Sequence, residues 1–263
     1  MWFNVKADLT YDFAAPTETL LLLEAARSPD QAVHSETLTI APEGPIARLD
    51  DSVTGERRAV FLAEGRCRIV YDAVVEVLAR DANLKGAEAI AVRDLPGDTL
   101  RYLMGSRYCP SDRFERFVDR QFAGIEGGDK VQAILDWIGA NVDYEIGVSD
   151  AATTAMDTFV DRAGVCRDFA HLTIALCRAA DIPARAVSVY AWKLKPADLH
   201  AVAEVYVGGR WRLVDATCKA PLDGMVRVAT GQDAADIAFM TIFGKATLAA
   251  QAFSIRRVRP PTR

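Results

Sequence analysis

The chain has 263 residues, which is the length of one large domain or two smaller ones. Hydrophobic residues make up 51% of it and charged residues 25%, a balance that is typical of globular proteins and excludes a disordered chain. The formal net charge is −5, so the sequence lacks the basic excess that general nucleic-acid binding requires.

No segment predicts a secretory leader or a membrane span. Residues 1–6 do not combine a basic start with an apolar run, and the densest apolar run, residues 20–23, is far shorter than the roughly 20 residues that cross a bilayer. The five cysteines include no C-x-x-C pair, so neither a disulfide framework nor a cysteine zinc site is expected. We therefore expect a cytoplasmic protein without a metal or cofactor.

The first 95 residues are predicted to form strands. Residues 3–13 alternate apolar side chains with other residues, which is the period of a half-buried strand. Further β-like segments cover residues 19–25, 33–40, 58–63 and 66–79, with turn residues between them. This spacing predicts a β-sandwich or barrel-like N-terminal domain over residues 1–95.

After residue 96 the period of the apolar residues changes to that of helices. Predicted helices cover residues 114–122, 131–138, 154–164 and 166–180, and predicted strands cover residues 185–191, 201–207 and 210–216. The sequence therefore predicts an α+β domain over residues 96–250. The arginine-rich residues 251–263 are expected to form a loose basic tail.

A cysteine stands at the start of one predicted helix. Cys166 follows Gly164 and Val165, and the free amide N–H groups and dipole of a helix start favour a thiolate, the nucleophilic form of the side chain. Position alone leaves open that Cys166 is a small buried packing residue. Asp168 lies in the same helical turn, where a carboxylate suits the helix dipole.

Three histidines are available as a catalytic base. His34 lies in the β-rich part with no reactive residue near it in sequence. His171 follows Cys166 by five positions, which turns it about 140° away around the helix, so it is expected to be a packed or supporting residue. His200 is the remaining candidate.

A predicted hairpin connects this histidine with a carboxylate. Two strands flank Gly208-Gly209, a strong signal for a two-residue turn. If these glycines form the turn, Val202 lies opposite Asp215 and His200 lies diagonal to Asp215, about 7–8 Å away on the same face. A nucleophile, a base and an orienting carboxylate then follow in the order Cys166, His200 and Asp215.

Several segments carry a family resemblance. Residues 164–171 read G-V-C-R-D-F-A-H, which resembles the G-V-C-x-D-F-A-H signature of bacterial transglutaminase-like proteins. Residues 182–185, 198–201 and 211–217 resemble further segments of this family, in the same order. The β-rich start resembles the N-terminal domain that is often attached to these proteins.

This resemblance implies a papain-like core with the cysteine on a central helix and the histidine and aspartate on adjacent strands. It also implies thiol chemistry on amides, either hydrolysis or acyl transfer to an amine. The chain departs from the family pattern at Arg167, where glutamine is common, at Val202 in place of tryptophan, and at Ala216 in place of proline. None of these changes removes a catalytic atom.

Five further residues are candidates for supporting roles. Tyr144 is a candidate second donor to the oxyanion, beside the backbone N–H of the nucleophile, and Trp192 is a candidate for the rim of the substrate groove. Asp168, His171 and Thr217 are expected to support the triad from behind.

Three hypotheses follow. The first is a cysteine protease, amidohydrolase or transglutaminase-like acyltransferase that acts on a peptide or protein amide through a thioester. The second is a catalytically weak or inactive peptide-binding protein of the same fold, suggested by the changes at Val202 and Ala216. The third, a metal site that uses His171 and His200 with Asp or Cys ligands, lacks any familiar ligand spacing. No nucleic-acid or membrane partner is expected.

Overall fold

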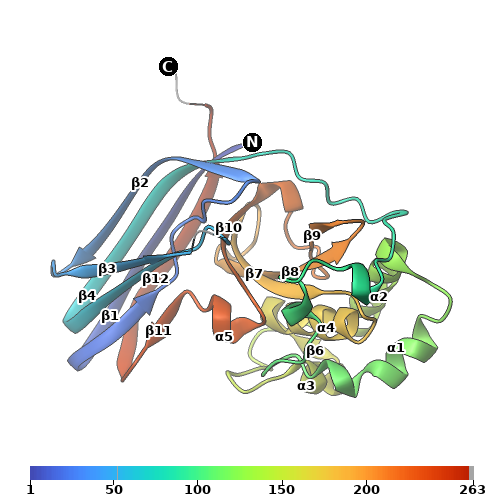
Figure 1. Cartoon of the computed structure of the whole chain (residues 1–263). Coiled ribbons are helices and arrows are strands. Elements are labelled where there is room, and N and C mark those ends of the chain that lie inside the picture. Colours follow the sequence, from blue (N-terminus) through green and yellow to red (C-terminus); the bar gives the residue numbers. More distant parts are fainter. Residues whose placement is uncertain (52, 261–263) are drawn as a thin grey trace.

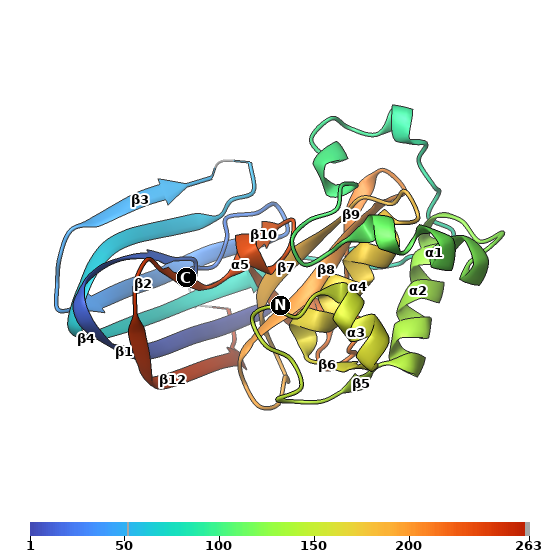
Figure 2. The same cartoon turned by 90° about the horizontal axis from the view of Figure 1, so that it is seen from below.

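The structure is a computed structural model that describes residues 1–51 and 53–260 (Figure 1). It has two parts that lie side by side, a curved β-sheet and a mixed part in which helices cover a second sheet. Figure 2 shows the helices on the side away from the first sheet, except the short helix at residues 234–237, which lies toward that sheet. No helix in these described ranges is long and apolar enough to cross a membrane. The expected α+β class is confirmed.

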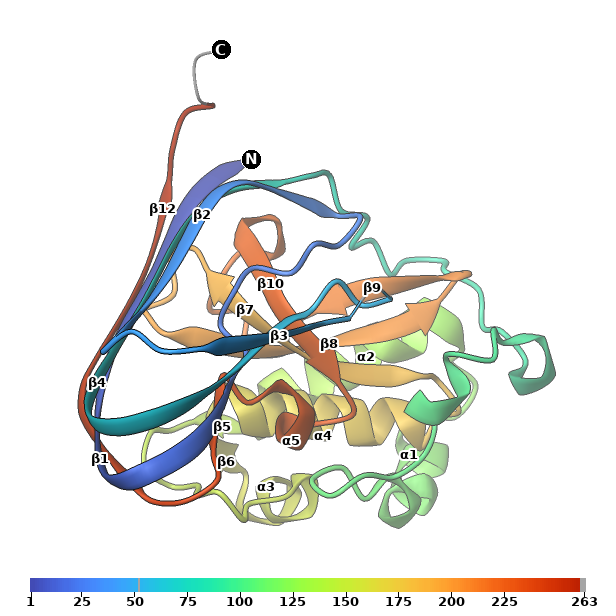
Figure 3. The ribbon, with the colours of Figure 1, turned by 60° about the vertical axis from the view of Figure 1, so that its left-hand side comes forward.

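The first sheet is antiparallel, and successive side chains along its strands point to opposite faces of the sheet. Its members are β1 (Trp2–Leu21), β2 (Gln31–Ala41), β3 (Ile46–Asp50), β4 (Arg57–Val77), β11 (Met240–Ile242) and β12 (Ala246–Arg257). Along β1 every second residue is buried, as the apolar alternation predicts. The expected antiparallel β domain is confirmed, but its strands form one open sheet that curves along one side of the molecule, in place of the expected sandwich or closed barrel (Figure 3).

The length of β1 and β4 explains this difference. The residues around Gly65 look like a turn in the sequence, but they lie inside β4, opposite a register shift of β1 between Phe13 and Thr17. Gly65 has a positive φ of 62° there. A glycine within a strand permits such an irregularity, so both strands bend and continue where the sequence suggests two shorter strands.

The expected loose tail is also wrong for most of its length. β12 pairs antiparallel with β1, from Phe3 opposite Arg257 to Phe13 opposite Ala246. Backbone hydrogen bonds make this edge strand, and the buried Phe253 anchors it against Tyr190. Residues 240–257 therefore belong to the first sheet and not to the second part of the chain; residues 261–263 of the expected tail lie outside the described residues.

The second part is built around α4 (Cys166–Arg178), which packs on the sheet β10-β7-β8-β9. These strands are β7 (Ala184–Ala191), β8 (Leu199–Val207), β9 (Arg210–Val214) and β10 (Met225–Gly231). The other elements are α1 (Glu115–Gln121), α2 (Gly127–Asn141), β5 (Asp143–Tyr144), α3 (Ala155–Asp161), β6 (Ala163–Gly164), α5 (Ala234–Ile237) and the short 3₁₀ turns Val92–Asp94, Leu100–Tyr102, Ser111–Arg113 and Leu222–Gly224. Because α4 is covered by α2, α3 and the sheet, it is buried on nearly all sides after its first turn.

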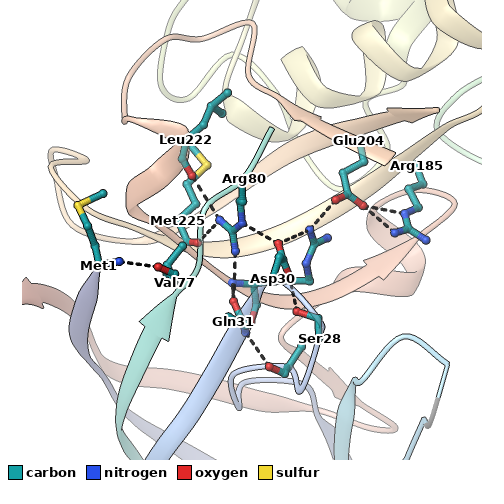
Figure 4. A network of polar contacts seen from close by, with 12 residues as sticks. Met1, Ser28, Asp30, Gln31, Val77, Arg80, Arg185, Glu204, Leu222 and Met225 are labelled. Atoms are coloured by element: carbon teal, nitrogen blue, oxygen red, sulfur yellow. Dashed lines mark hydrogen bonds and ion pairs between the residues drawn. The ribbon is translucent and has the colours of Figure 1, made fainter. Parts of the chain in front are cut away.

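Buried charges join the two parts (Figure 4). Arg227 of β10 binds Asp30, at 3.1 Å, and Glu204 of β8. Asp30, which precedes β2, also accepts a hydrogen bond from Arg80 at 2.6 Å. Away from this network, the hydroxyl of Tyr190 donates to the backbone carbonyl of Leu23. These contacts fix the sheet that carries His200 to the N-terminal sheet.

Candidate active site

The start of α4 is held by a fully buried carboxylate. Oδ2 of Asp168 accepts a hydrogen bond of 2.8 Å from the backbone N–H of Val165, which satisfies a free donor of the helix start. Gly164 lies against this side chain, and a Cβ at that position would come 2.7 Å from the Cβ of Asp168. This packing presents Cys166, which is partly exposed, at the first position of the helix.

Arg167 neutralises the buried carboxylate. Its Nε and one terminal nitrogen donate to Oδ1 of Asp168 at 3.2 and 3.1 Å, and the same terminal nitrogen donates to the backbone carbonyl of Asp150 at 2.6 Å. The guanidinium therefore joins α4 to the loop that follows β5. The residue that departs from the family pattern next to the nucleophile has a local structural partner.

The structure brings His200 and Asp215 together through the hairpin that the sequence predicts. Val207 pairs with Arg210, and Gly208 and Gly209 have positive φ values of 59° and 77°, which a two-residue hairpin turn of this type requires. Nε2 of His200 lies 2.9 Å from Oδ2 of Asp215, and neither side chain is more than 4% exposed. The register places the two on one face of the sheet.

The other nitrogen of the imidazole is free. Nδ1 of His200 is buried and has no hydrogen-bond partner within the described chain. Burial acts to lower the pKa of His200, but the hydrogen bond to Asp215 and the nearby Cys166 thiol outweigh it and raise that pKa to about 9. The imidazole is therefore held as a cation at neutral pH, with Asp215 bound to Nε2 and Cys166 close enough to raise its pKa.

Thr217 fixes the orientation of the carboxylate. Its hydroxyl and its backbone N–H donate to Oδ1 of Asp215 at 2.8 and 2.9 Å. This leaves Oδ2 of Asp215 for the imidazole of His200. Thr217 thus supports the His200–Asp215 pair through the carboxylate of Asp215.

His171 lies outside this group. Its Nε2 accepts a hydrogen bond from the backbone N–H of Ala234 at 3.1 Å, and its ring stacks on Tyr108 with 5.1 Å between ring centroids. Burial lowers the pKa of His171 to about 4, so the ring is neutral near pH 7. It joins α4 to the segment that begins α5.

The two aromatic candidates lie in different places. Tyr144 of β5 pairs with Gly164 in the parallel bridge, and burial together with the adjacent Cys166 raises the pKa of its hydroxyl. Trp192 instead packs against Phe3 of the first sheet, and its backbone N–H binds Gly224. Trp192 is therefore not among the residues that line the cavity beside Cys166 and His200, and its role at the rim of a substrate groove stays a prediction.

A cavity of about 540 Å³ opens beside Cys166 and His200. Its wall includes Ile237, Phe239 and Met240, and Gln251 of β12 also lines it. None of these four residues is expected from the sequence to have a role in the site. Their position depends on the return of the chain to the first sheet, a long-range pairing that no local pattern shows. Part of this cavity therefore comes from residues beyond the predicted triad.

No cluster of three or more histidine, cysteine or acidic side chains suited to a metal ion occurs in residues 1–51 and 53–260.

Comparison with known proteins agrees with the fold. Residues 1–98 match the family model of the bacterial transglutaminase N-terminal domain, and residues 118–216 match that of the transglutaminase-like superfamily. The chain therefore belongs to the transglutaminase-like superfamily and carries the bacterial transglutaminase N-terminal domain.

Two relatives are informative. The "Putative Cysteine Protease" from Cytophaga hutchinsonii, known from a crystal structure, is 39% identical, superposes with a TM-score of 0.93, and is matched over 100% of this chain and 92% of that one. "Uncharacterized protein ML0607" of Mycobacterium leprae (strain TN) is 29% identical over 116 residues. That match covers 41% of this chain and 42% of the relative, so the chain spans less than half of that protein.

Proposed function

We propose that this protein is a cysteine-dependent enzyme that transfers the acyl group of a peptide or side-chain amide through a thioester. The observation that carries the proposal is the imidazole of His200, with Asp215 bound to Nε2 and Nδ1 left free on the side of Cys166. This is the arrangement that a cysteine nucleophile with an oriented base requires. The similarity to the "Putative Cysteine Protease" from Cytophaga hutchinsonii supports the same reaction class.

The reaction begins with an ion pair between the Cys166 thiolate and the His200 imidazolium. The sulfur attacks the amide carbon, and the carbonyl electron pair moves onto the oxygen. When the tetrahedral intermediate collapses, the C–N bond breaks and His200 gives its proton to the leaving amine. Water or a second amine then attacks the thioester, loses a proton to His200, and releases the acyl group as an acid or a new amide while sulfur leaves as thiolate.

The negative charge that develops on the substrate's carbonyl oxygen needs hydrogen-bond donors close to the Cys166 sulfur. The backbone N–H of Cys166, at the start of α4, supplies one donor, and the dipole of the helix adds a positive potential there. The hydroxyl of Tyr144 lies beside Cys166 and is the second donor in this proposal. Thr217 acts as a positioning residue because it holds the orienting carboxylate of Asp215.

A trapped acyl-enzyme tests this proposal. A library of synthetic peptides and glutamine analogues is incubated with the protein, and intact mass is recorded with and without a primary amine. We expect a mass increase on wild-type protein that Cys166→Ala lacks, together with product release that falls at least a thousandfold in that variant. Transfer of the acyl group to the amine identifies acyltransferase activity; release of the acid alone identifies hydrolysis.

A second cysteine variant is the matched control. Cys67 is buried in β4, away from the cavity, so Cys67→Ala should keep the mass increase and the turnover of wild type. Turnover at the wild-type level by Cys166→Ala would overturn the proposal. Peptide binding of equal affinity in both proteins, without turnover by wild type, would indicate the non-catalytic alternative.

A further inference from the structure

The cavity beside Cys166 and His200 contains an uneven set of charges. Besides this pair, the described residues that line it include only two charged side chains, Arg167 and Asp198. Arg167 is committed to Asp168 and to a backbone carbonyl, so its positive charge is compensated within the protein. The charge that remains without a counterion in the cavity is that of Asp198.

Asp198 lies immediately before β8, two residues ahead of His200, and it is open to solvent at the mouth of the cavity. Its side chain accepts one hydrogen bond, from the backbone N–H of Leu199 at 2.8 Å, and no described cation pairs with it. The protein atoms around the carboxyl raise its pKa, with no nearby positive group to oppose the effect. A partly desolvated carboxylate without a partner is stabilised by a ligand that supplies the opposite charge.

The rest of the cavity defines what such a ligand carries. Ile237, Phe239 and Met240 form an apolar part of the wall of the same cavity, which suits the aliphatic carbon of a ligand. Ser188 on the neighbouring strand β7 also lines the cavity, and its buried hydroxyl has no hydrogen-bond partner among the described residues. An apolar wall with an unpaired acid and a free hydroxyl favours an alkyl chain that ends in a cation.

We propose that Asp198 determines the specificity of this cavity and binds a cationic group, such as the ammonium of a lysine side chain, on the peptide whose amide is cleaved. The inference rests on the proposed function for its reaction and extends it to the class of substrate. The ammonium forms an ion pair with the carboxylate, while the aliphatic stem lies along the wall at residues 237–240.

Matched peptides test this inference. Peptide amides that differ at one position, which carries lysine, norleucine or glutamate, are compared for kcat/KM with wild type and with Asp198→Asn. We expect wild type to prefer lysine to norleucine by about tenfold at the position that enters the cavity, and Asp198→Asn to abolish this ratio. Asp198→Lys should shift the preference toward glutamate. Asp119→Asn, an exposed carboxylate on α1, is the control and should keep the wild-type ratio.

Binding separates this inference from the proposed function. If wild type turns over none of the peptides, the affinities of Cys166→Ala for the same set are measured by fluorescence anisotropy, with and without Asp198→Asn. A lysine preference that depends on Asp198 supports the inference even if the catalytic proposal fails. Equal binding or turnover of lysine and norleucine peptides, or a lysine preference that survives Asp198→Asn, overturns it.

Discussion

At the scale of single residues, the site depends on how one imidazole is held. His200 is buried, which alone would favour its neutral form, yet Asp215 and Cys166 together keep it protonated. Thr217 contributes indirectly, because it fixes the carboxylate oxygen that does not face the ring. The electrostatic state of the proposed catalytic pair is therefore set mainly by Asp215.

Replacing this carboxylate should change the pH dependence. In wild type the alkaline limb of the kcat/KM profile should lie near pH 9, where His200 loses its proton. In Asp215→Asn burial prevails, so the pKa of His200 falls, the alkaline limb moves to lower pH, and kcat falls about a hundredfold or more. Steady-state kinetics and NMR titration of the three histidines measure both effects.

The same shift has a consequence for stability. Because the folded-state pKa of His200 lies above its ordinary value of 6.5, its stabilising contribution is complete below pH 6.5 and disappears as the pH rises through about 9. Urea unfolding of wild type and Asp215→Asn should therefore differ more at pH 6 than at pH 10. His171, with its pKa lowered to about 4, serves as the internal control. An unchanged titration of His200 in the variant would contradict this account.

Most of the residue-level site could be predicted from the sequence, because its geometry is local. A two-glycine turn fixes the register between β8 and β9, and that register alone brings Asp215 to His200. That Cys166 lies near His200 is implied only by the family resemblance, since this proximity depends on how α4 packs on the sheet. The position of the Trp192 ring could not be predicted from the sequence, because the residue it packs against, Phe3, is distant in the sequence.

At the scale of elements, the joint between β6 and α4 leaves no room for a side chain at Gly164. β6 ends at Gly164 and the helix begins two residues later, so the backbone of Gly164 lies directly against the side chain of Asp168. Helical periodicity predicts where α4 lies, but it does not reveal that a side chain at residue 164 would collide with the carboxylate that caps the helix. The position of Cys166 depends on this contact.

A methyl group at this joint should disturb both folding and activity. Gly164→Ala places a Cβ 2.7 Å from the Cβ of Asp168, so the helix start must shift; we expect a loss of about 1–3 kcal/mol in the free energy of unfolding, with lower kcat. Gly139→Ala is the control, since a Cβ there meets nothing closer than 3.9 Å and a helix-interior alanine should stabilise by about 0.5–1 kcal/mol. Wild-type stability of Gly164→Ala in urea would show that the joint relaxes freely.

At the scale of the whole molecule, buried ion pairs hold the N-terminal sheet to the part that carries the site. Arg227 lies between Asp30 of the N-terminal part and Glu204 of β8, and it is 7% exposed. Charge pairs at this depth are costly to break from one side only, because each remaining carboxylate loses one of its two cationic partners. The two parts should therefore unfold as one unit.

Single and double variants test this coupling. Arg227→Met should lower the free energy of unfolding by about 3–5 kcal/mol, since it leaves Glu204 and Asp30 without this cation. Arg227→Met combined with Glu204→Met should be less destabilised than the sum of the single changes, because the double variant removes both members of this buried pair and leaves neither charge without the other. Urea unfolding followed by two probes, one in each part, measures the cycle. Additive effects, or two separate transitions, would contradict the coupling.

The whole-molecule arrangement was the least predictable from the sequence. Composition and periodicity separate a β-rich start from a mixed remainder, and both are present. The return of β12 to β1 could not be predicted because an edge strand is made by backbone hydrogen bonds, while its small, mostly exposed side chains show no buried stripe. Long-range pairing of this kind leaves almost no local pattern.

The path of the chain also has a consequence for biosynthesis. Cys166 leaves the ribosome well before Gln251, yet both border the same cavity. β12 can pair with β1 only after most of the chain has been translated, because the two strands lie near opposite ends of the sequence. The reactive thiol is thus made early, while the chamber that would receive a substrate is completed late. A nascent chain can therefore complete the wall of this cavity only after the residues of β12 have emerged.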